Sequence, residues 1–305
     1  MKNFQHFGIK QRVYPEYNYH AVWSNLKTVR LGTGSAKELP PDHSEFYDVS
    51  LGTKCNLQCP FCYVAATKSG KFYKNIVEKA EEFFGKMSEN QKPFQIAIGS
   101  EGEPTIHPQF KEFVEKVYEL GIVPNYTTNG ITLAKGDWYT NNLLDLTEKY
   151  CGGVAVSANN FNWEIDGVWR MAVDRLLSID VYTNLHIIIK DKQSVERLKE
   201  IYDTYGDKIH TYVLLPMMPE GRSTESVSRE TYQDLCNLFQ QIEHKDHFAF
   251  GANFYPFIID GSYENQIQCS LYEPESFSKN LILDDPIRIT PSSFNRKTTL
   301  YEKNI

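Results

Sequence analysis

The chain has 305 residues, of which 41% are hydrophobic and 23% are charged, and its formal net charge is −7. This length suits one large α/β domain with appendages or two ordinary domains, and the composition excludes a chain that is disordered throughout. Proteins that coat nucleic acid broadly are usually basic, so the acidic balance excludes general nucleic-acid binding.

The sequence shows no sign of membrane insertion or export. No apolar run approaches the roughly 20 residues of a membrane span, and the first 20 residues lack the apolar core of a secretory signal. We therefore expect a cytoplasmic protein with no membrane partner. In that reducing compartment, cysteines more often bind metals or take part in chemistry than form disulfides.

The predicted elements alternate regularly after an irregular start. Residues 1–45 are interrupted by prolines and are interpreted as an N-terminal extension, not a separate domain. From Phe46 onward, short apolar runs alternate with amphipathic stretches long enough for helices. The predicted strands are 47–52, 94–99, 123–128, 153–158, 182–189 and 211–216. The predicted helices are 75–87, 108–120, 138–150, 168–179 and 194–205.

This alternation predicts a parallel sheet with right-handed crossovers. Six strand–helix units favour an α/β fold that is an open, partial (β/α)6 TIM-like barrel over a closed barrel of eight units. The predicted core covers residues 46–257, followed by a C-terminal appendage at 258–305 that is rich in Ser, Asn, Asp and Pro. The apolar run 248–259 is a candidate for a further strand of the sheet.

Three of the six cysteines stand close together, directly after the first predicted strand of the core. Cys55, Cys59 and Cys62 fall where the carboxyl ends of parallel strands form ligand sites. Three thiolates can bind three irons of one cubane cluster, whereas an electron carrier normally supplies a fourth cysteine. The next cysteine is Cys151. The spacing therefore predicts one [4Fe–4S] cluster with an open iron position, which is where a metal does chemistry.

Other interpretations of this cysteine triplet stay open. The three side chains could pack in a core by chance. A structural zinc site would need a fourth ligand, and His43 is a candidate at no usual spacing. A thioredoxin-like pair of Cys59 and Cys62 would leave Cys55 unexplained.

The triplet, with aromatic Phe61 before its last cysteine, resembles the signature loop of the radical SAM superfamily. The resemblance implies that Cys55, Cys59 and Cys62 hold the cluster and that S-adenosylmethionine (SAM) chelates the fourth iron. One electron would then break the sulfur–C5′ bond, giving methionine and a 5′-deoxyadenosyl radical that takes a hydrogen atom from the substrate. It also implies that Phe61 lies by the adenine and that a one-electron donor, such as a flavodoxin or ferredoxin, is a partner.

Further positions within 46–257 resemble the family's SAM-binding residues. The segment after the second predicted strand resembles the family's Gly-Gly-Glu-Pro motif, with Glu101 in place of the first glycine. It implies contacts to the amino group of SAM from Ser100, Glu101, Gly102, Glu103 and Pro104, although a simple turn before a helix is the alternative. By the same resemblance, Ser157, Asn184 and Arg170 are candidates for the ribose and carboxylate of SAM, and Leu215 for its adenine.

The substrate is not identified by the sequence. Side chains expected at the same strand ends are candidates for catalysis or substrate binding, and each could instead only pack: Tyr126, Asn129, Asn159, His186, Arg222 and Tyr255. A small molecule or nucleotide is preferred slightly to a peptide or protein, because neither an N-terminal peptide-binding domain nor auxiliary clusters are evident. Cys269 is the one cysteine beyond the core. A non-catalytic Fe–S or zinc module is the alternative of another class.

Overall fold

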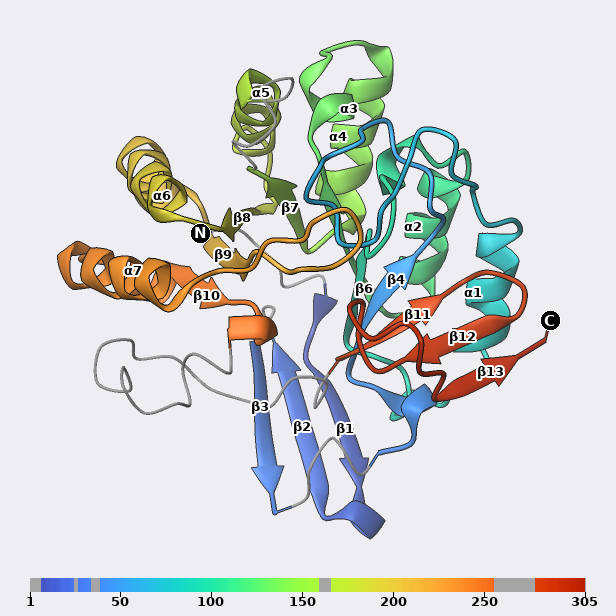
Figure 1. Cartoon of the computed structure of the whole chain (residues 1–305). Coiled ribbons are helices and arrows are strands. Elements are labelled where there is room, and N and C mark those ends of the chain that lie inside the picture. The colour runs from blue at the N-terminus through green and yellow to red at the C-terminus, as the bar shows by residue number, and fades with distance from the viewer. Residues whose placement is uncertain (1–6, 25–26, 34–38, 159–165, 255–277, 305) are drawn as a thin grey trace.

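The computed structural model describes residues 7–24, 27–33, 39–158, 166–254 and 278–304 (Figure 1). Its centre is a ten-stranded sheet in the order β10-β9-β8-β7-β6-β5-β4-β11-β12-β13. Strands β4 to β10 are all parallel to their neighbours. Their bounds are β4 Phe46–Ser50, β5 Gln95–Ile98, β6 Val123–Thr128, β7 Gly153–Ser157, β8 Tyr182–Ile189, β9 Thr211–Pro216 and β10 Phe248–Phe250.

Helices follow the parallel strands and form an arc around the outside of the curved sheet (Figure 1). They are α1 Ile76–Phe84, α2 Phe110–Glu119, α3 Ile131–Ala134, α4 Trp138–Tyr150, α5 Asp166–Leu176, α6 Lys192–Tyr205 and α7 Arg229–Gln241. The predicted partial α/β barrel is confirmed, and the run at 248–259 does begin with a seventh parallel strand, β10. No helix within the described ranges combines the length and apolarity needed to cross a membrane.

The main core lies between the sheet and these helices, and strand alternation decides which side chains enter it. In β8, Leu185 and Ile187 are buried against the helices, whereas His186 and Ile188 face the inside of the barrel. The inward-facing side chains near the carboxyl ends of the strands are therefore available to build a site.

The expectation of an irregular N-terminus is wrong. Strands β1 Lys10–Tyr14, β2 Tyr19–Ser24 and β3 Lys27–Gly32 form an antiparallel sheet of their own. Tyr19, Ala21 and Trp23 alternate with more exposed residues, and this buried face packs with Phe94 and Val123 at the amino ends of β5 and β6. The small sheet thus lies away from the strand ends that carry the cysteines.

The predicted C-terminal appendage is also wrong for the described residues 278–304. Strand β11 Ser278–Ile282 pairs in parallel with β4, and β12 Ile287–Thr290 and β13 Tyr301–Lys303 continue the sheet as antiparallel strands. Apolar residues such as Leu281 and Ile289 are fully buried in the main core, which the polar composition of the surrounding sequence conceals. The segment between β12 and β13 consequently returns to the cysteine loop.

Candidate active site

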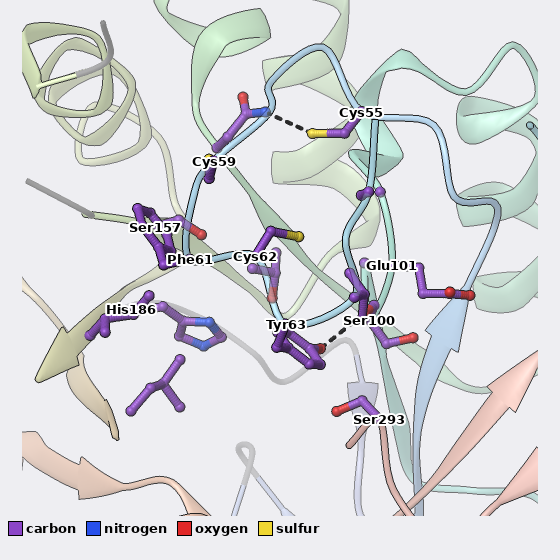
Figure 2. A pocket seen from close by; sticks show the side chains of 18 of the residues that line it. Cys55, Cys59, Phe61, Cys62, Tyr63, Ser100, Glu101, Ser157, His186 and Ser293 are labelled. Carbon is purple, nitrogen blue, oxygen red and sulfur yellow. Dashed lines mark hydrogen bonds between the residues drawn. The ribbon is translucent and has the colours of Figure 1, made fainter. Parts of the chain in front are cut away.

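The carboxyl ends of β4 to β9 surround a cavity of about 330 Å³. Cys55, Cys59 and Cys62 all line it, and Figure 2 shows them on the loop that arches over the strand ends. Inward-facing residues of the strands form the rest of the wall together with loop residues: Asp48, Ala97, Thr127, Ser157, His186, Ile188, Leu215, Ser293 and Phe294 among them. The topology therefore gathers the cysteine triplet and most of the predicted ligand positions at one place.

The backbone of the cysteine loop is held in a defined shape. The Cys55 amide donates to the carbonyl of Thr67 at 2.9 Å, and the Cys62 amide donates to the carbonyl of Cys59 at 3.2 Å. Gly102 fits under this loop because a Cβ atom there would lie 2.4 Å from the Lys54 carbonyl oxygen, and its φ of +65° also favours glycine. The segment after β5 that contains Gly102 is thus held against the cysteine loop.

The sulfur atoms suit a metal cluster. The Leu57 amide and the Asn129 side-chain amide point at the Cys55 sulfur from 3.4 and 3.9 Å. Burial raises the pKa of the Cys55 thiol to about 12, so a thiolate there requires a positive partner such as iron. None of the cysteines in the described segments forms a disulfide.

The donor set does not suit a single zinc ion. Within the described residues, no three His, Cys, Asp or Glu side chains converge on one metal position. A cubane cluster makes no such demand, because each thiolate binds a different iron. The candidate fourth ligand His43 packs against Tyr14 of the N-terminal sheet, with ring centroids 5.8 Å apart, and does not line the cavity.

Arg222 is a loop brace and not a wall of the cavity. Its Nε donates to the Cys59 carbonyl at 2.7 Å and its Nη1 to the Ala66 carbonyl at 2.9 Å, while its backbone amide donates to the Cys62 carbonyl at 3.1 Å. Its interpretation as a substrate ligand is therefore corrected: the guanidinium is used to hold the cysteine loop.

The segment after β5 is held by its own acidic side chains. Glu103 accepts hydrogen bonds from the Asn129 amide, from the Thr128 hydroxyl and from both the amide and the hydroxyl of Thr105. Since both carboxylate oxygens are engaged, Glu103 orders the segment. Pro104, which does not line the cavity, begins a short 3-10 helix and packs under Gly99.

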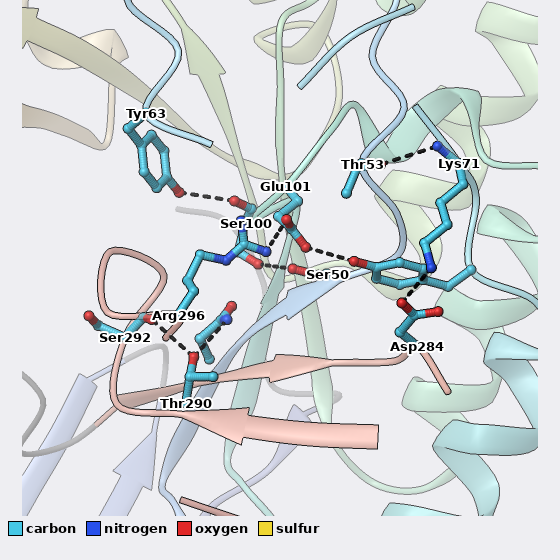
Figure 3. A network of polar contacts seen from close by, with 12 residues as sticks. Ser50, Thr53, Tyr63, Lys71, Ser100, Glu101, Asp284, Thr290, Ser292 and Arg296 are labelled. Carbon is cyan, nitrogen blue, oxygen red and sulfur yellow. Dashed lines mark hydrogen bonds and ion pairs between the residues drawn. The ribbon is translucent and has the colours of Figure 1, made fainter. Parts of the chain in front are cut away.

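Glu101 and Ser100 connect this segment to distant parts of the chain (Figure 3). The Glu101 carboxylate forms an ion pair with Arg296 and accepts a hydrogen bond from the Tyr73 hydroxyl at 3.0 Å. The Ser100 carbonyl accepts from the Tyr63 hydroxyl at 3.0 Å. With both acidic side chains engaged, backbone carbonyls of this segment are the acceptors left for the ammonium group of a ligand.

Four further predicted residues line the cavity: Phe61, Ser157, His186 and Leu215. Ser157 and His186 are register partners on β7 and β8, and Figure 2 shows both near Phe61. Burial lowers the pKa of His186 to about 4, so its imidazole is neutral near pH 7 and can both donate and accept a hydrogen bond.

Other predicted residues lie elsewhere. Tyr126 faces the helices, where its hydroxyl is 2.8 Å from that of Thr147, because Thr127 takes the inward direction on β6. The side-chain amide of Asn129 is bonded to Asn56 of the cysteine loop at 2.7 Å, so Asn129 serves that loop even though it touches the cavity.

Arg170 and Asn184 do not line the cavity either. The Arg170 guanidinium lies over the ring of its neighbour Trp169, 4.4 Å from the centroid, on α5. Asn184 is one inward-facing position before His186 on β8 and so lies deeper in the barrel. Asn159, Tyr255 and Cys269 fall outside the described residues.

Several wall residues were not predicted from the sequence, among them Asp48, Tyr63, Ser293 and Phe294. Asp48 could have been predicted as a site residue from the sequence, because it is a lone charged residue inside an apolar strand. The rings of Tyr63 and Phe294 pack at a tilt with centroids 4.5 Å apart, which joins the cysteine loop to a segment more than 200 residues away in sequence. No local sequence pattern predicts the contact between Tyr63 and Phe294.

Comparison with known proteins agrees with this geometry. Residues 49–227, more than half of the chain, match the family model of the Radical SAM superfamily. A 7,8-dihydro-6-hydroxymethylpterin dimethyltransferase of Methanocaldococcus jannaschii is 28% identical over 99 residues, covering 31% of this chain and 20% of that protein. A tungsten-containing aldehyde ferredoxin oxidoreductase cofactor-modifying protein of Pyrococcus furiosus is 28% identical over 91 residues, covering 28% of this chain and 24% of that protein.

Solved structures share the fold at low sequence identity. Streptococcus suis SuiB bound to S-adenosylmethionine is 13% identical, with a TM-score of 0.61, and the match covers 86% of this chain and 63% of SuiB. The structure of anSMEcpe with bound AdoMet and the Cp18Cys peptide is 15% identical, with a TM-score of 0.56, and covers 82% of this chain and 74% of that one. The chain thus spans less than two thirds of SuiB and about a fifth to a quarter of the two curated relatives.

Proposed function

Because the chain belongs to the radical SAM superfamily, whose members use a [4Fe–4S] cluster and SAM, we propose that it cleaves SAM reductively and applies the resulting radical to a bound substrate. One electron from a donor such as a reduced flavodoxin or ferredoxin breaks the sulfur–C5′ bond, methionine leaves, and the 5′-deoxyadenosyl radical takes one hydrogen atom from the substrate. The products of that step are 5′-deoxyadenosine and a substrate radical. Thiols stay reduced in the cytoplasm, which is the compartment that suits this loop.

The proposal rests on one observation. The three cysteines and the segment 99–103, which resembles a SAM-binding motif, line the same cavity. Cys55, Cys59 and Cys62 supply three thiolates, and no fourth cysteine of the described ranges lines the cavity. Cys151 and Cys236 are buried elsewhere, on the helical side of the sheet. A cluster on this loop would keep one iron open for a chelating ligand.

We expect different residues of the cavity to bind different parts of SAM. Carbonyl groups of residues 99–102 would accept from its ammonium group, and the Tyr63 hydroxyl holds the Ser100 carbonyl in place. Phe61 and Leu215 offer apolar surface for the adenine, and the Ser157 hydroxyl is within the same wall for the ribose. His186, neutral at pH 7, lies beside Ser157 and is a candidate for contact with the substrate.

A small molecule is the proposed substrate class, since the cavity is only about 330 Å³ and lies among the strand ends and the segment after β12. A second candidate is a side chain of a peptide or protein. SuiB has been solved bound to its precursor peptide SuiA, at 15% identity and a TM-score of 0.60, and anSMEcpe with a peptide. Both structures resemble this chain in fold alone. They therefore keep a peptide or protein side chain as the second candidate and do not place it ahead of a small molecule.

Electron paramagnetic resonance tests the proposal against a non-catalytic Fe–S module. The wild type, Cys59→Ala and the control Cys236→Ala are reconstituted anaerobically with iron and sulfide, reduced with dithionite, and recorded with and without SAM. We expect the wild type and the control to give a cluster signal whose g-values change when SAM is added. A cluster signal indifferent to SAM at saturating concentration would support an electron carrier and reject the proposal.

A further inference from the structure

The charges around the cavity are unevenly distributed. Its charged wall residues in the described ranges are Asp48, Glu101 and Glu103, with no lysine or arginine among them. The nearby guanidinium of Arg222 is engaged with the carbonyls of the cysteine loop, and that of Arg296 with Glu101. As far as the structure describes its wall, the cavity therefore carries acidic side chains and no lysine or arginine.

A phosphate or carboxylate ligand would meet no lysine or arginine among the described wall residues of the cavity. Recognition of an anion normally uses lysine or arginine side chains.

Asp48 differs from the two glutamates in having an unengaged carboxylate. Glu103 is saturated by hydrogen bonds, and Glu101 is shared between Arg296 and Tyr73. Within the described part of the chain no hydrogen bond or ion pair engages Asp48, and burial alone raises its pKa to about 7. The partly exposed Asp48 carboxylate lines the cavity, and a cationic ligand there would favour its ionised form.

The depth of Asp48 separates it from the segment proposed to bind SAM. Asp48 is the register partner of Ala97 on β5, whereas residues 99–103 follow the end of that strand. Asp48 thus faces the inner part of the cavity, below the level of the cysteine loop. Ser293 and Phe294 close the same compartment from the segment after β12.

From this geometry we infer that the substrate carries a cationic group, an ammonium or guanidinium, which pairs with Asp48 inside the barrel while the hydrogen to be abstracted lies toward the cysteine loop. The inference deepens the proposed function and rests on it, since it concerns the substrate side of the same cavity.

A charge-matched panel of probes tests the inference on the reconstituted enzyme with SAM bound. The probes are n-pentylammonium, 1-pentanol and pentanoate, and binding is followed by saturation-transfer NMR at about pH 8.5, where the carboxylate is ionised and the amine protonated. We expect pentylammonium to bind at least about tenfold more tightly than the alcohol, a difference of about 1.4 kcal/mol. Pentanoate should bind most weakly.

Variants assign the preference to Asp48. Asp48→Asn should reduce the preference for the cation to within about twofold, while the control Asp203→Asn, which alters an exposed ion pair on α6, should leave it unchanged. Asp48→Ser serves if the asparagine variant does not assemble a cluster. Equal binding of cation and alcohol by the wild type, tighter binding of pentanoate, or an undiminished preference in both Asp48 variants would overturn the inference.

SAM cleavage without substrate keeps the two proposals apart. The wild type and the control Asp203→Asn should both form 5′-deoxyadenosine when reduced with dithionite in the absence of substrate, because Asp203 lies in an exposed ion pair on α6. A wild type that cleaves SAM yet shows no cation preference rejects the inference alone. A wild type that holds a cluster and does not cleave SAM rejects the proposed function.

Discussion

Arg222 donates a hydrogen bond from its Nε atom to the carbonyl oxygen of Cys59 at 2.7 Å, across 163 residues of sequence. With the second bond to Ala66, the guanidinium joins the middle and the end of the cysteine loop to the segment after β9. Hydrogen bonds from charged donors contribute about 1.5–3 kcal/mol each. The loop that supplies the thiolates is therefore stabilised by a residue outside it.

We predict that Arg222→Met loosens the cluster without abolishing the fold. Iron should be lost to a chelator about tenfold faster than from the wild type, and Arg222→Lys should fall in between because a lysine can replace one of the two bonds. Absorbance of the cluster during chelation measures both rates. Arg197→Met is the matched control, since Arg197 lies on α6 and pairs with the exposed Glu200, away from the cysteine loop. Equal rates of iron loss from Arg222→Met and Arg197→Met would show that Arg222 does not stabilise the cysteine loop.

Gly221 lies against the same loop and gives a second prediction. A Cβ atom at Gly221 would be 2.3 Å from the Cys62 carbonyl oxygen and 2.4 Å from that of Tyr63, and φ is +64°. Gly221→Ala should therefore displace the loop and reduce reconstituted iron to less than about half. Gly206→Ala is the control, because Gly206 also has a positive φ, +51°, but nothing lies within 4 Å of its added Cβ. It should cost about 1–3 kcal/mol of backbone strain and keep full iron content.

The fold was predictable from the sequence where local patterns decide it. Strands β6, β8 and β9 begin and end at the predicted residues, since their apolar runs are bounded by turn residues. The N-terminal sheet was missed because its prolines and tyrosines obscured the alternation of Tyr19, Ala21 and Trp23. The polar surroundings of β11 and β12 concealed strands that the main sheet itself stabilises.

The candidate site was predictable only in part. Residues near the cysteines in sequence, such as Phe61, were found because one short loop carries them. The engagement of Arg222 with Cys59 and of Arg296 with Glu101 depends on chain segments that meet only in the folded protein. Tyr126 was misassigned although the neighbouring Thr127 offered the alternation that turns it toward the helices.

The ion pair of Glu101 and Arg296 gives a stability prediction. Glu101 is 4% exposed, so Arg296→Met leaves a buried carboxylate with only the Tyr73 hydroxyl, and the expected loss is about 3 kcal/mol. The double variant Glu101→Gln/Arg296→Met should recover most of that loss in urea unfolding. Lys199→Met, which breaks an exposed pair with Asp203, should cost less than about 1 kcal/mol. Additive losses in the double variant would show that the two side chains are not coupled.

His186 gives a pH prediction. Its pKa is lowered to about 4 in the folded protein from an ordinary value near 6.5, so between these values the unfolded chain binds more protons. Its contribution to stability is present above about pH 6.5 and is lost as the pH falls toward 4. Between pH 7 and 5 the wild type should lose about 2 kcal/mol more than His186→Gln, measured by urea unfolding. An identical loss in both proteins would mean that His186 titrates normally.

Formation of 5′-deoxyadenosine tests the central claim most directly. Anaerobically reconstituted wild type, Cys59→Ala and Cys236→Ala are mixed with SAM and dithionite, and the products are separated by chromatography. We expect 5′-deoxyadenosine and methionine from the wild type and from Cys236→Ala, and neither from Cys59→Ala. Wild-type protein that carries a [4Fe–4S] cluster and leaves SAM intact, or product formation by Cys59→Ala at the wild-type rate, would contradict it.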